Sequence, residues 1–273
     1  MTIKIGITGA TGRMGRMLAE TIFKRDDICQ LTAAIERQES SLNGADMGEL
    51  LGIGVNGTTV GIDLAAAITG IDVLIDFTMP EATLPYAALC ARYRVPMVVG
   101  TTGFTDAQIS QLHAITQDIP LCQSANFSPG VNLAFTLVEA AARALGQSVD
   151  IEIAEAHHRH KIDAPSGTAL ALGDVLASVQ GRELSEMAVY AREGRTGVRE
   201  RGTIGFSVIR AGDIVGDHTV IFAGEGERLE IPHKASSRSA FAAGAVTAAC
   251  WLAGQPAGRY SMRDVLASEE TGS

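Results

Sequence analysis

The chain has 273 residues, carries a formal net charge of −9 and is 46% hydrophobic. That length fits one large or two modest domains, each able to bury a core, so a disordered protein is excluded. An acidic chain repels a polyanion, which argues against nucleic-acid binding. No apolar run reaches the roughly 18–20 residues that span a bilayer, and the amino terminus resembles neither a signal peptide nor a transit peptide. The composition therefore predicts a soluble, cytoplasmic protein that binds neither membranes nor nucleic acids.

The amino-terminal segment combines a strand pattern with a glycine-rich turn. An apolar run over residues 3–7 leads into Gly9, Gly12 and Gly15, and helix-forming residues follow. Read strictly, the spacing is GxxGxxG, with Thr11 where the dinucleotide-binding fingerprint has its second glycine. Glycines at such a turn let the backbone approach a pyrophosphate while helix N–H groups face the anion. The segment is therefore predicted to bind a dinucleotide.

Two charged residues follow the second expected strand, residues 31–35. Glu36 stands about 20 residues after the glycines, where Rossmann folds place an acid that binds the adenosine ribose, as in NAD-binding proteins. Arg37 could instead pair with a 2′-phosphate, as in NADP-binding proteins. The alternative is that both are exposed loop charges. The sequence thus predicts NADH or NADPH and leaves the choice open.

Strands and helices then continue to alternate through the first half of the chain. Strands are expected at 73–76, 96–100 and 119–123, and helices at 80–93, 106–116 and about 131–145. Ligands of an open parallel sheet bind beyond the carboxyl ends of its strands. The small and polar residues at 100–102 and 124–127 are therefore candidate walls of a nicotinamide pocket, with ordinary loops as the alternative.

A basic segment in the middle of the chain is the most informative one. Apolar and acidic residues alternate from Val149, which predicts a half-buried strand and places Glu155 and His157 on one face at its end. Three of the six histidines lie between residues 157 and 160, Arg159 lies among them and Lys161 follows. Because clustered cations repel one another, we expect this segment to bind an anion or to deliver a proton.

Two alternatives for the basic segment are a metal site and a solvated surface run. The metal site is disfavoured because HxxH here lies outside a helix and has no cysteine nearby. The four cysteines, at positions 29, 90, 122 and 250, are far apart and lack zinc-type spacing, so they are expected to be reduced structural thiols. No metal is predicted.

A helix is expected to begin immediately after the basic segment, at Pro165. Helix amino termini bind anions through their N–H groups, so Gly167 and Thr168 could hold a substrate carboxylate, and Ser166 could simply cap the helix. These two functions are compatible. Two anion sites this close in the sequence suggest a small diacid as the ligand.

The pattern changes to consecutive strands after residue 202. Three β-type segments follow one another without an intervening helix, at 203–210, 217–224 and 227–234. A meander of antiparallel strands cannot join a parallel sheet, so a second α+β domain with a mixed or antiparallel sheet is predicted. The last forty residues return to helix, with Phe241, Ala245, Ala248 and Leu252 on one face, and this helix is expected to pack on the first domain.

These motifs together resemble the 4-hydroxy-tetrahydrodipicolinate reductase (dihydrodipicolinate reductase) family of the diaminopimelate route to lysine. The resemblance spans almost the whole chain and is carried by GATGRMG, Glu36-Arg37, DFT (76–78), GTTGF (100–104), ANFSPGVN (125–132), EAHHRHKIDAPSGTAL (155–170), GTIGF and RAGDIVGDH. The EAHHRHKIDAPSGT string is far more specific than a glycine loop.

The resemblance implies a fold and an activity. The fold is a Rossmann-like, doubly wound parallel sheet made of residues 1–128 and 238–273, with a substrate-binding and oligomerisation domain inserted at 129–237, in a homotetramer. The substrate is a small dicarboxylate, (4S)-4-hydroxy-2,3,4,5-tetrahydrodipicolinate, which loses its 4-hydroxyl as water and receives a hydride from NADH or NADPH. The alternatives are another two-domain NAD(P)-dependent dehydrogenase of a small dicarboxylate, or a dinucleotide sensor without catalysis.

The resemblance also implies roles for individual residues. The catalytic pair is His157 and Lys161, and the substrate-binding residues are His158, His160, Gly167 and Thr168. The cofactor-binding residues are Gly9, Ala10, Thr11, Gly12, Arg13 and Met14 at the pyrophosphate, Glu36 and Arg37 at the ribose, and Gly100, Thr101, Thr102, Ser124, Ala125, Asn126 and Phe127 at the nicotinamide.

Overall fold

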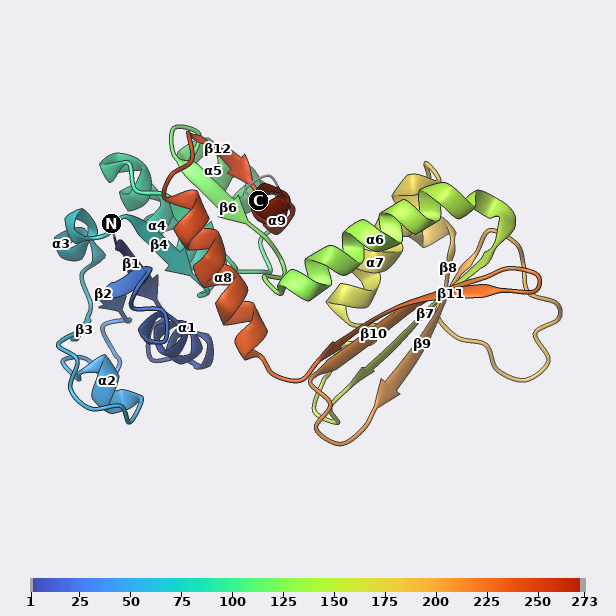
Figure 1. Ribbon diagram of the computed structural model, residues 1–273, viewed down its shortest axis with the longest axis horizontal. Coiled ribbons are helices and arrows are strands. Elements are labelled where there is room, and N and C mark those ends of the chain that lie inside the picture. The colour runs from blue at the N-terminus through green and yellow to red at the C-terminus, as the bar shows by residue number, and fades with distance from the viewer. Residues whose placement is uncertain (1, 271–273) are drawn as a thin grey trace. The chain divides into compact units, whose positions relative to one another are not determined.

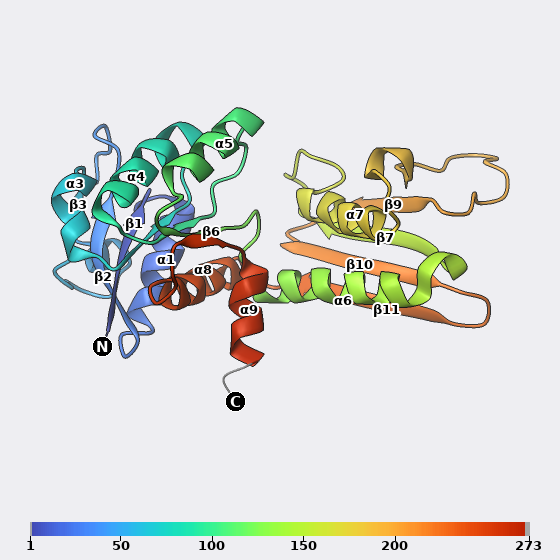
Figure 2. The same ribbon diagram turned by 90° about the horizontal axis from the view of Figure 1, so that it is seen from above.

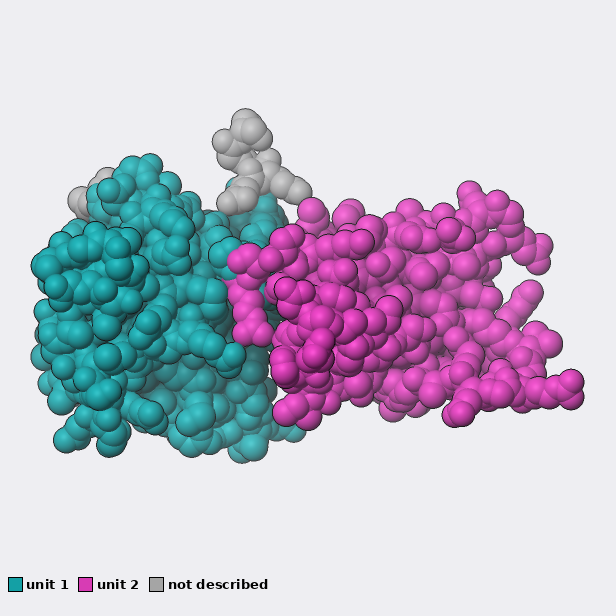
Figure 3. Space-filling view, turned by 90° about the horizontal axis from the view of Figure 1, so that it is seen from below, with its two compact units in different colours: residues 1–129, 239–273 teal, residues 130–238 magenta. Residues whose placement is uncertain are grey.

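The computed structural model describes residues 2–270, and the chain divides into two compact units (Figure 3). Unit 1 comprises residues 1–129 and 239–273, and unit 2 comprises residues 130–238. Each boundary lies one residue from the predicted one. Among the described residues, no helix is long and apolar enough to cross a membrane.

Unit 1 alternates strands and helices along the chain. Its strands are β1 (Ile3–Thr8), β2 (Cys29–Ile35), β3 (Val60–Gly61), β4 (Val73–Asp76), β5 (Met97–Val99), β6 (Pro120–Gln123) and β12 (Gly258–Tyr260). Its helices are α1 (Arg13–Phe23), α2 (Met47–Leu50), α3 (Leu64–Ala67), α4 (Pro80–Tyr93), α5 (Asp106–Ile115), α8 (Ser239–Leu252) and α9 (Met262–Glu270). Within residues 2–270 the seven strands pair in parallel in the order β12-β6-β5-β4-β1-β2-β3 (Figure 1), so the predicted doubly wound parallel sheet is confirmed.

The central strands of unit 1 are buried on both faces. All four residues of β4 are buried, as expected of a parallel strand that has helices above and below it. One core cluster joins the sheet to α1 and α8, through residues such as Leu18 and Ala245. The other joins it to α4 and α5, through residues such as Cys90 and Leu112. The expected packing of the carboxyl-terminal helix on the first domain is therefore confirmed.

Local sequence explains several element boundaries in unit 1. Pro80 begins α4 because its fixed φ suits the first helical position, and Arg94 ends the helix in a left-handed conformation with φ +57°.

The four cysteines are free thiols, as predicted. The short elements β3, β12, α2 and α3 carry no clear periodic pattern, and the sequence did not indicate them.

Unit 2 contains a mixed sheet. Its strands are β7 (Asp150–His157), β8 (Ala188–Val189), β9 (Ile204–Arg210), β10 (Gly216–Ala223) and β11 (Arg228–Ala235), and its long helices are α6 (Pro129–Leu145) and α7 (Gly167–Val179). In the described part of the chain the strand order is β11-β10-β7-β9-β8. β10 pairs antiparallel with β7 and β11, whereas β9 pairs parallel with β7 and β8.

The predicted antiparallel meander of β9, β10 and β11 is wrong at its first step. β7 lies between β9 and β10, and the loop from Ala211 to Val215 crosses over the carboxyl end of β7. Its backbone is tied there by hydrogen bonds from Ala211 N–H to the His157 carbonyl and from His158 N–H to the Ile214 carbonyl, at 2.9 and 2.7 Å. A five-residue connection of this kind spans an intervening strand, which a tight hairpin turn could not do.

Helices cover one face of the unit 2 sheet. Figure 2 shows α6 and α7 lying along that face, where Val138, Leu172 and Leu176 form a core with alternate residues of the strands. In the described part of unit 2 no helix covers the opposite face. That face carries Ile209 and Ile221 together with small residues and with the acidic Asp150, Glu152 and Asp217, and Ile209 is 55% exposed.

Candidate active site

The glycine-rich loop lies at the carboxyl end of β1 and needs glycine at two of its three positions. Gly9 has a φ of +63°, a left-handed conformation that favours glycine. A Cβ at Gly15 would lie 2.2 Å from the Gly9 carbonyl oxygen, so α1 can approach the loop only without a side chain there. The turn is closed by a 3.0 Å hydrogen bond from Gly12 N–H to the Gly9 carbonyl.

The first turn of α1 fits the pyrophosphate of a dinucleotide. Its N-cap residue, Gly12, has no side chain to accept from the helix N–H groups, and the first turn has no acidic residue. Those N–H groups and the positive end of the helix dipole favour an anion. Of the neighbouring predicted residues, Arg13 is exposed, Met14 is half-buried and Ala10 is buried.

Glu36 braces the glycine-rich loop from the end of β2. Its Oε1 accepts hydrogen bonds from Thr11 N–H at 3.1 Å and Thr11 Oγ1 at 2.9 Å, and its Oε2 accepts from Arg37 N–H at 3.0 Å. The Arg37 guanidinium is exposed. The structure therefore brings the predicted ribose-binding pair together with the predicted pyrophosphate loop.

A buried carboxylate at the same sheet edge was missed as a functional residue. Asp76 ends β4, is 0% exposed, and accepts hydrogen bonds from the hydroxyls of Thr8, Thr78, Thr83 and Thr101. The Thr101 bond is 2.9 Å long, and Thr101 Oγ1 also accepts from Thr78 N–H at 3.0 Å. Asp76 therefore ties the end of β1, the loops after β4 and β5 and the first turn of α4 together. The DFT motif contained it, but three residues of sequence gave no sign of the partners.

The other predicted nicotinamide-side residues differ in exposure. Thr102 and Ala125 are exposed, whereas the Phe127 side chain is buried in the core, with its ring 5.4 Å from that of Phe77. Ser124 Oγ accepts a hydrogen bond from Met262 N–H at 2.9 Å. A cofactor contact at Phe127 could therefore come only from its backbone.

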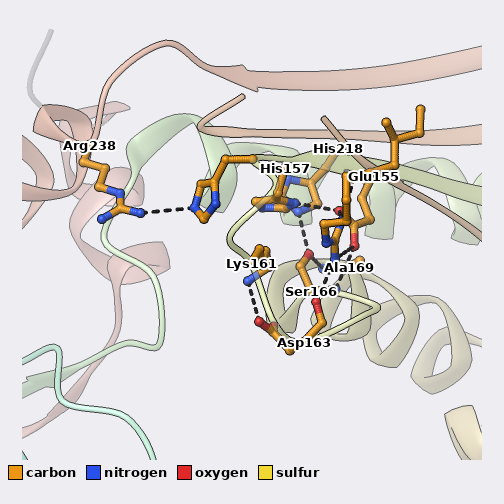
Figure 4. Close-up of polar contacts among 11 residues, drawn as sticks. Glu155, His157, Lys161, Asp163, Ser166, Ala169, His218 and Arg238 are labelled. Atoms are coloured by element: carbon orange, nitrogen blue, oxygen red, sulfur yellow. Dashed lines mark hydrogen bonds and ion pairs between the residues drawn. The ribbon is translucent and has the colours of Figure 1, made fainter. Parts of the chain in front are cut away.

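Glu155 is the centre of the polar cluster in unit 2 (Figure 4). Its side chain is 0% exposed, on the same face of β7 as His157, as the alternation predicted. Oε2 accepts from His157 Nδ1 at 2.6 Å, and Oε1 accepts from Ser166 N–H at 3.0 Å. Arg210 binds both carboxylate oxygens, each at 2.8 Å. Burial alone would raise the pKa of Glu155, but the hydrogen bonds from Arg210, His157 and Ser166 hold it below its usual range.

His218 completes the buried part of the cluster. It faces Glu155 across the β7–β10 pair, and its ring centroid lies 5.1 Å from that of His157. Its Nε2 forms a 2.9 Å hydrogen bond with Ser166 Oγ, which also caps α7 by accepting from Ala169 N–H at 3.2 Å. Burial, reinforced by the adjacent His157, lowers the pKa of His218 to about 4. His218 is therefore neutral at physiological pH.

The remaining predicted residues surround this buried group. Lys161 pairs with Asp163 at 2.9 Å, which holds the pKa of Asp163 below its usual range. His158 lies 6.2 Å from the exposed His160, ring to ring, and 3.5 Å from Arg238 Nη2. Burial and the neighbouring positive charges lower the pKa of His158. Gly167 is exposed and Thr168 is half-buried in the first turn of α7.

The arrangement is suited to binding an anion and moving a proton. Lys161, Arg159 and Arg238 supply positive charge, the first turn of α7 supplies N–H groups, and His157 is held by one ring nitrogen. Among residues 2–270 no group of three histidine, cysteine or carboxylate side chains could hold a metal ion.

Four unit 2 residues in this cluster were not predicted to lie at the site: Asp163, Arg210, His218 and Arg238. The motif RAGDIVGDH begins with Arg210 and ends with His218, and EAHHRHKIDAPSGTAL contains Asp163, so the resemblance contained three of them without indicating a role. No local pattern could have paired Arg210 with Glu155, which lies 55 residues away.

Two family models together cover nearly the whole chain. One, described as the N-terminus of dihydrodipicolinate reductase, matches residues 3–127. The other, described as the C-terminus of dihydrodipicolinate reductase, matches residues 130–266.

Curated relatives and a solved structure agree with the family models. Two proteins named 4-hydroxy-tetrahydrodipicolinate reductase, from Alkalilimnicola ehrlichii and Saccharophagus degradans, are 59% and 54% identical to this chain over 266 residues, which is 97% of this chain and 99% of each relative. A dipicolinate-bound dihydrodipicolinate reductase from Paenisporosarcina sp. TG-14 has a similar structure, with a TM-score of 0.76 and 26% identity over 96% of this chain and 98% of that one.

Proposed function

Since the chain belongs to the dihydrodipicolinate reductase family, we propose that it catalyses the NAD(P)H-dependent reduction of (4S)-4-hydroxy-2,3,4,5-tetrahydrodipicolinate to tetrahydrodipicolinate with loss of water, in the diaminopimelate route to lysine. The observation that carries this proposal is the buried Glu155–His157 pair beside Lys161 and the first turn of α7. A proton-handling histidine next to an anion site is what reduction of a dicarboxylate imine requires.

In unit 2 we assign His157 and Lys161 to proton transfer. Loss of the 4-hydroxyl leaves a conjugated imine, and reduction of that system adds one hydride and one proton. The substrate carboxylates would be held by the N–H groups at Gly167 and Thr168, by the positive charge of Lys161 and by a hydrogen bond from His158, with His160 at the rim. In the described part of the chain Lys161 pairs with one carboxylate, the partly exposed Asp163, and these roles explain why cations gather beside it.

In unit 1 we assign the pyrophosphate to Gly9–Met14 and the adenosine ribose to Glu36 and Arg37. The reduced nicotinamide, bound near residues 100–102 and 124–127, supplies the hydride. Glu36 already accepts three hydrogen bonds, two of them from Thr11, so ribose hydroxyls must share its oxygens. Arg37 is exposed and can meet a 2′-phosphate. Use of both NADH and NADPH is therefore proposed.

The uncovered face of the unit 2 sheet supports a homotetramer. Ile209 and Ile221 lie on that face, and association of such faces would bury them. Sedimentation equilibrium tests the assembly: a tetramer is expected, and a monomer at micromolar concentration would contradict it.

The proposal places the enzyme in the cytoplasm, where NADH and NADPH are regenerated.

Oxidation of NADPH and NADH with enzymatically generated substrate tests the activity. We expect both cofactors to be oxidised, with one tetrahydrodipicolinate formed per hydride. Cofactor binding without oxidation would indicate a sensor. Oxidation only with other small dicarboxylates would indicate a different dehydrogenase.

A further inference from the structure

We infer that Glu155 and Arg210 are positioning residues that fix His157 in one tautomer, with the proton on Nδ1 and with Nε2 as the nitrogen that exchanges a proton with the substrate. The inference deepens the proposed function and rests on it for the role of His157. It follows from three features of the cluster: the charge of Glu155, the contacts of Arg210 and the surroundings of Nε2.

The first feature is that Glu155 can only accept hydrogen bonds. Its buried carboxylate has four donors, the two Arg210 nitrogens, Ser166 N–H and His157 Nδ1. These donors keep the carboxyl ionised, and an ionised carboxylate has no proton to donate. The 2.6 Å contact with Nδ1 therefore requires the proton to be on Nδ1. In the neutral ring this leaves the lone pair on Nε2.

The second feature is that one guanidinium joins both proposed catalytic residues. Arg210 lies directly opposite His157 in the β7–β9 pair and donates two parallel hydrogen bonds to the Glu155 carboxylate. Its Nη2 also donates to the Asp163 carbonyl at 2.7 Å, and the Asp163 side chain pairs with Lys161. Arg210 therefore sets the position of the His157 ring and of the segment that carries Lys161 at the same time.

The third feature is that the ring is confined on its other sides. A Cβ at Gly216 would lie 3.0 Å from His157 Nε2, so a larger residue there would press on this nitrogen. His218 packs edge to face against the ring, and its own Nε2 is engaged by Ser166. In the part of the chain described, His157 Nε2 has no hydrogen-bond partner of its own, and the side chain keeps 10% exposure. Nε2 is thus the nitrogen left for a ligand.

The variant Glu155→Gln tests the inference because Arg210 dictates how an amide would fit. An amide oxygen at the Oε1 position accepts from Ser166 N–H and Arg210, and the NH₂ group then faces His157 Nδ1 and one Arg210 nitrogen. In the reverse orientation the NH₂ group would face two groups that can only donate, Ser166 N–H and one Arg210 nitrogen. The first orientation places it against only one such donor, the other Arg210 nitrogen. The preferred orientation donates to Nδ1 and moves the ring proton to Nε2.

The matched control is Glu152→Gln. Glu152 also lies on β7 and is bound by two arginines, Arg192 and Arg199, which hold its pKa low against the effect of burial, but it points to the opposite face. For Glu155→Gln we expect kcat to fall roughly 10–100-fold, the usual effect of removing a group that orients a functional histidine, with KM changed less than about threefold. For Glu152→Gln we expect neither value to change beyond about twofold.

Nitrogen-15 NMR of histidine-labelled protein gives a readout that a merely structural role would not move. With His157 assigned by subtracting the His157→Gln spectrum, we expect the Nδ1–H tautomer in the wild type and the Nε2–H tautomer in Glu155→Gln. An Nε2–H tautomer in the wild type would overturn the inference even if Glu155→Gln did not fold. The inference would also be overturned if Glu155→Gln kept both the kcat and the His157 tautomer of the wild type. If the wild type reduced no substrate, the proposed function would fail, whereas the tautomer would still be measured.

Discussion

Among the described residues, each unit contains one fully buried carboxylate at or near the carboxyl end of a strand, and the two differ in what binds them. Asp76 in unit 1 is held by four threonine hydroxyls, which are neutral and do not titrate. Glu155 in unit 2 is held by a guanidinium, an imidazole and a backbone N–H. Both sites satisfy the carboxylate, but only the second couples it to the imidazole that is proposed to exchange a proton with the substrate.

The difference shows that burial of a charge does not by itself identify a catalytic group. Asp76 ties the end of one strand, two loops and the start of α4 together. Glu155 instead controls a neighbour whose protonation matters for the proposed chemistry. Variants at the two sites should therefore affect different quantities: stability in unit 1 and turnover in unit 2.

The largest effect is expected for the proposed catalytic pair. His157→Ala or Lys161→Ala should lower turnover at least about 100-fold, the lower range for loss of a general acid or base, with NADPH oxidation as the measurement. Arg228→Ala removes an exposed arginine at the opposite end of the unit 2 sheet and should leave turnover within about threefold. Near-normal turnover in both variants would contradict the assignment of His157 and Lys161 to proton transfer.

The next largest effect is a pH dependence of stability from His218. Burial lowers the pKa of His218 in the folded chain to about 4 from 6.5, so the unfolded chain takes up the proton first as the pH falls. Stability is therefore lost between about pH 6.5 and pH 4, by at most about 3 kcal/mol, of which about 2 kcal/mol falls between pH 7 and pH 5.

Urea unfolding at pH 7 and pH 5 measures this dependence, and His218→Gln should remove most of it. His233→Gln is the control. Burial also lowers the pKa of the half-buried His233, so this variant tests whether loss of any such histidine changes the pH dependence as His218→Gln does. An equal pH dependence in the wild type and His218→Gln would show that His218 is not the group responsible.

A smaller effect is expected at the Asp76 site. Thr83→Val removes one of the four hydroxyls while keeping the size of the side chain, and should lower the free energy of unfolding by about 1–3 kcal/mol. Thr83→Ser keeps the hydroxyl and should cost less. If Thr83→Val lowered kcat in proportion to Glu155→Gln, the two carboxylates would not have the different roles described above.

The smallest effect concerns the cofactor. Arg37→Ala should raise KM for NADPH more than KM for NADH, because only NADPH carries the 2′-phosphate that the guanidinium could bind. Arg92→Ala, at the far end of α4, removes another arginine of unit 1 and should change neither value. Equal changes in both KM values for Arg37→Ala would exclude a role in reading the phosphate.

Much of this fold follows from local pattern. The bounds of α4 follow from Pro80 and from the end of its apolar face, and the alternation from Val149 placed Glu155 and His157 on the buried face of β7. Ser166 was expected as a cap, and its hydroxyl does accept from Ala169 N–H. In each case the relevant interactions lie within a few residues of one another.

The rest depended on contacts between distant segments. The pairing of β9 with β7 rather than β10 is decided by the path of the loop after Arg210, which no period in the sequence reveals. The partners of Glu155 and Asp76 lie up to 68 residues away. A single sequence shows that such side chains are polar but not which of them meet.

Successive side chains of β7 point alternately to two surfaces of unit 2, so both surfaces depend on the register of this one strand. Ile151, Ile153, Glu155 and His157 point to the helix-covered face, and the residues between them point to the open face. Inserting or deleting one residue before Glu155 would exchange the two sets and lose the proposed catalytic geometry and the exterior surface together. Changes in this strand can therefore accumulate as substitutions but not as single-residue shifts in length.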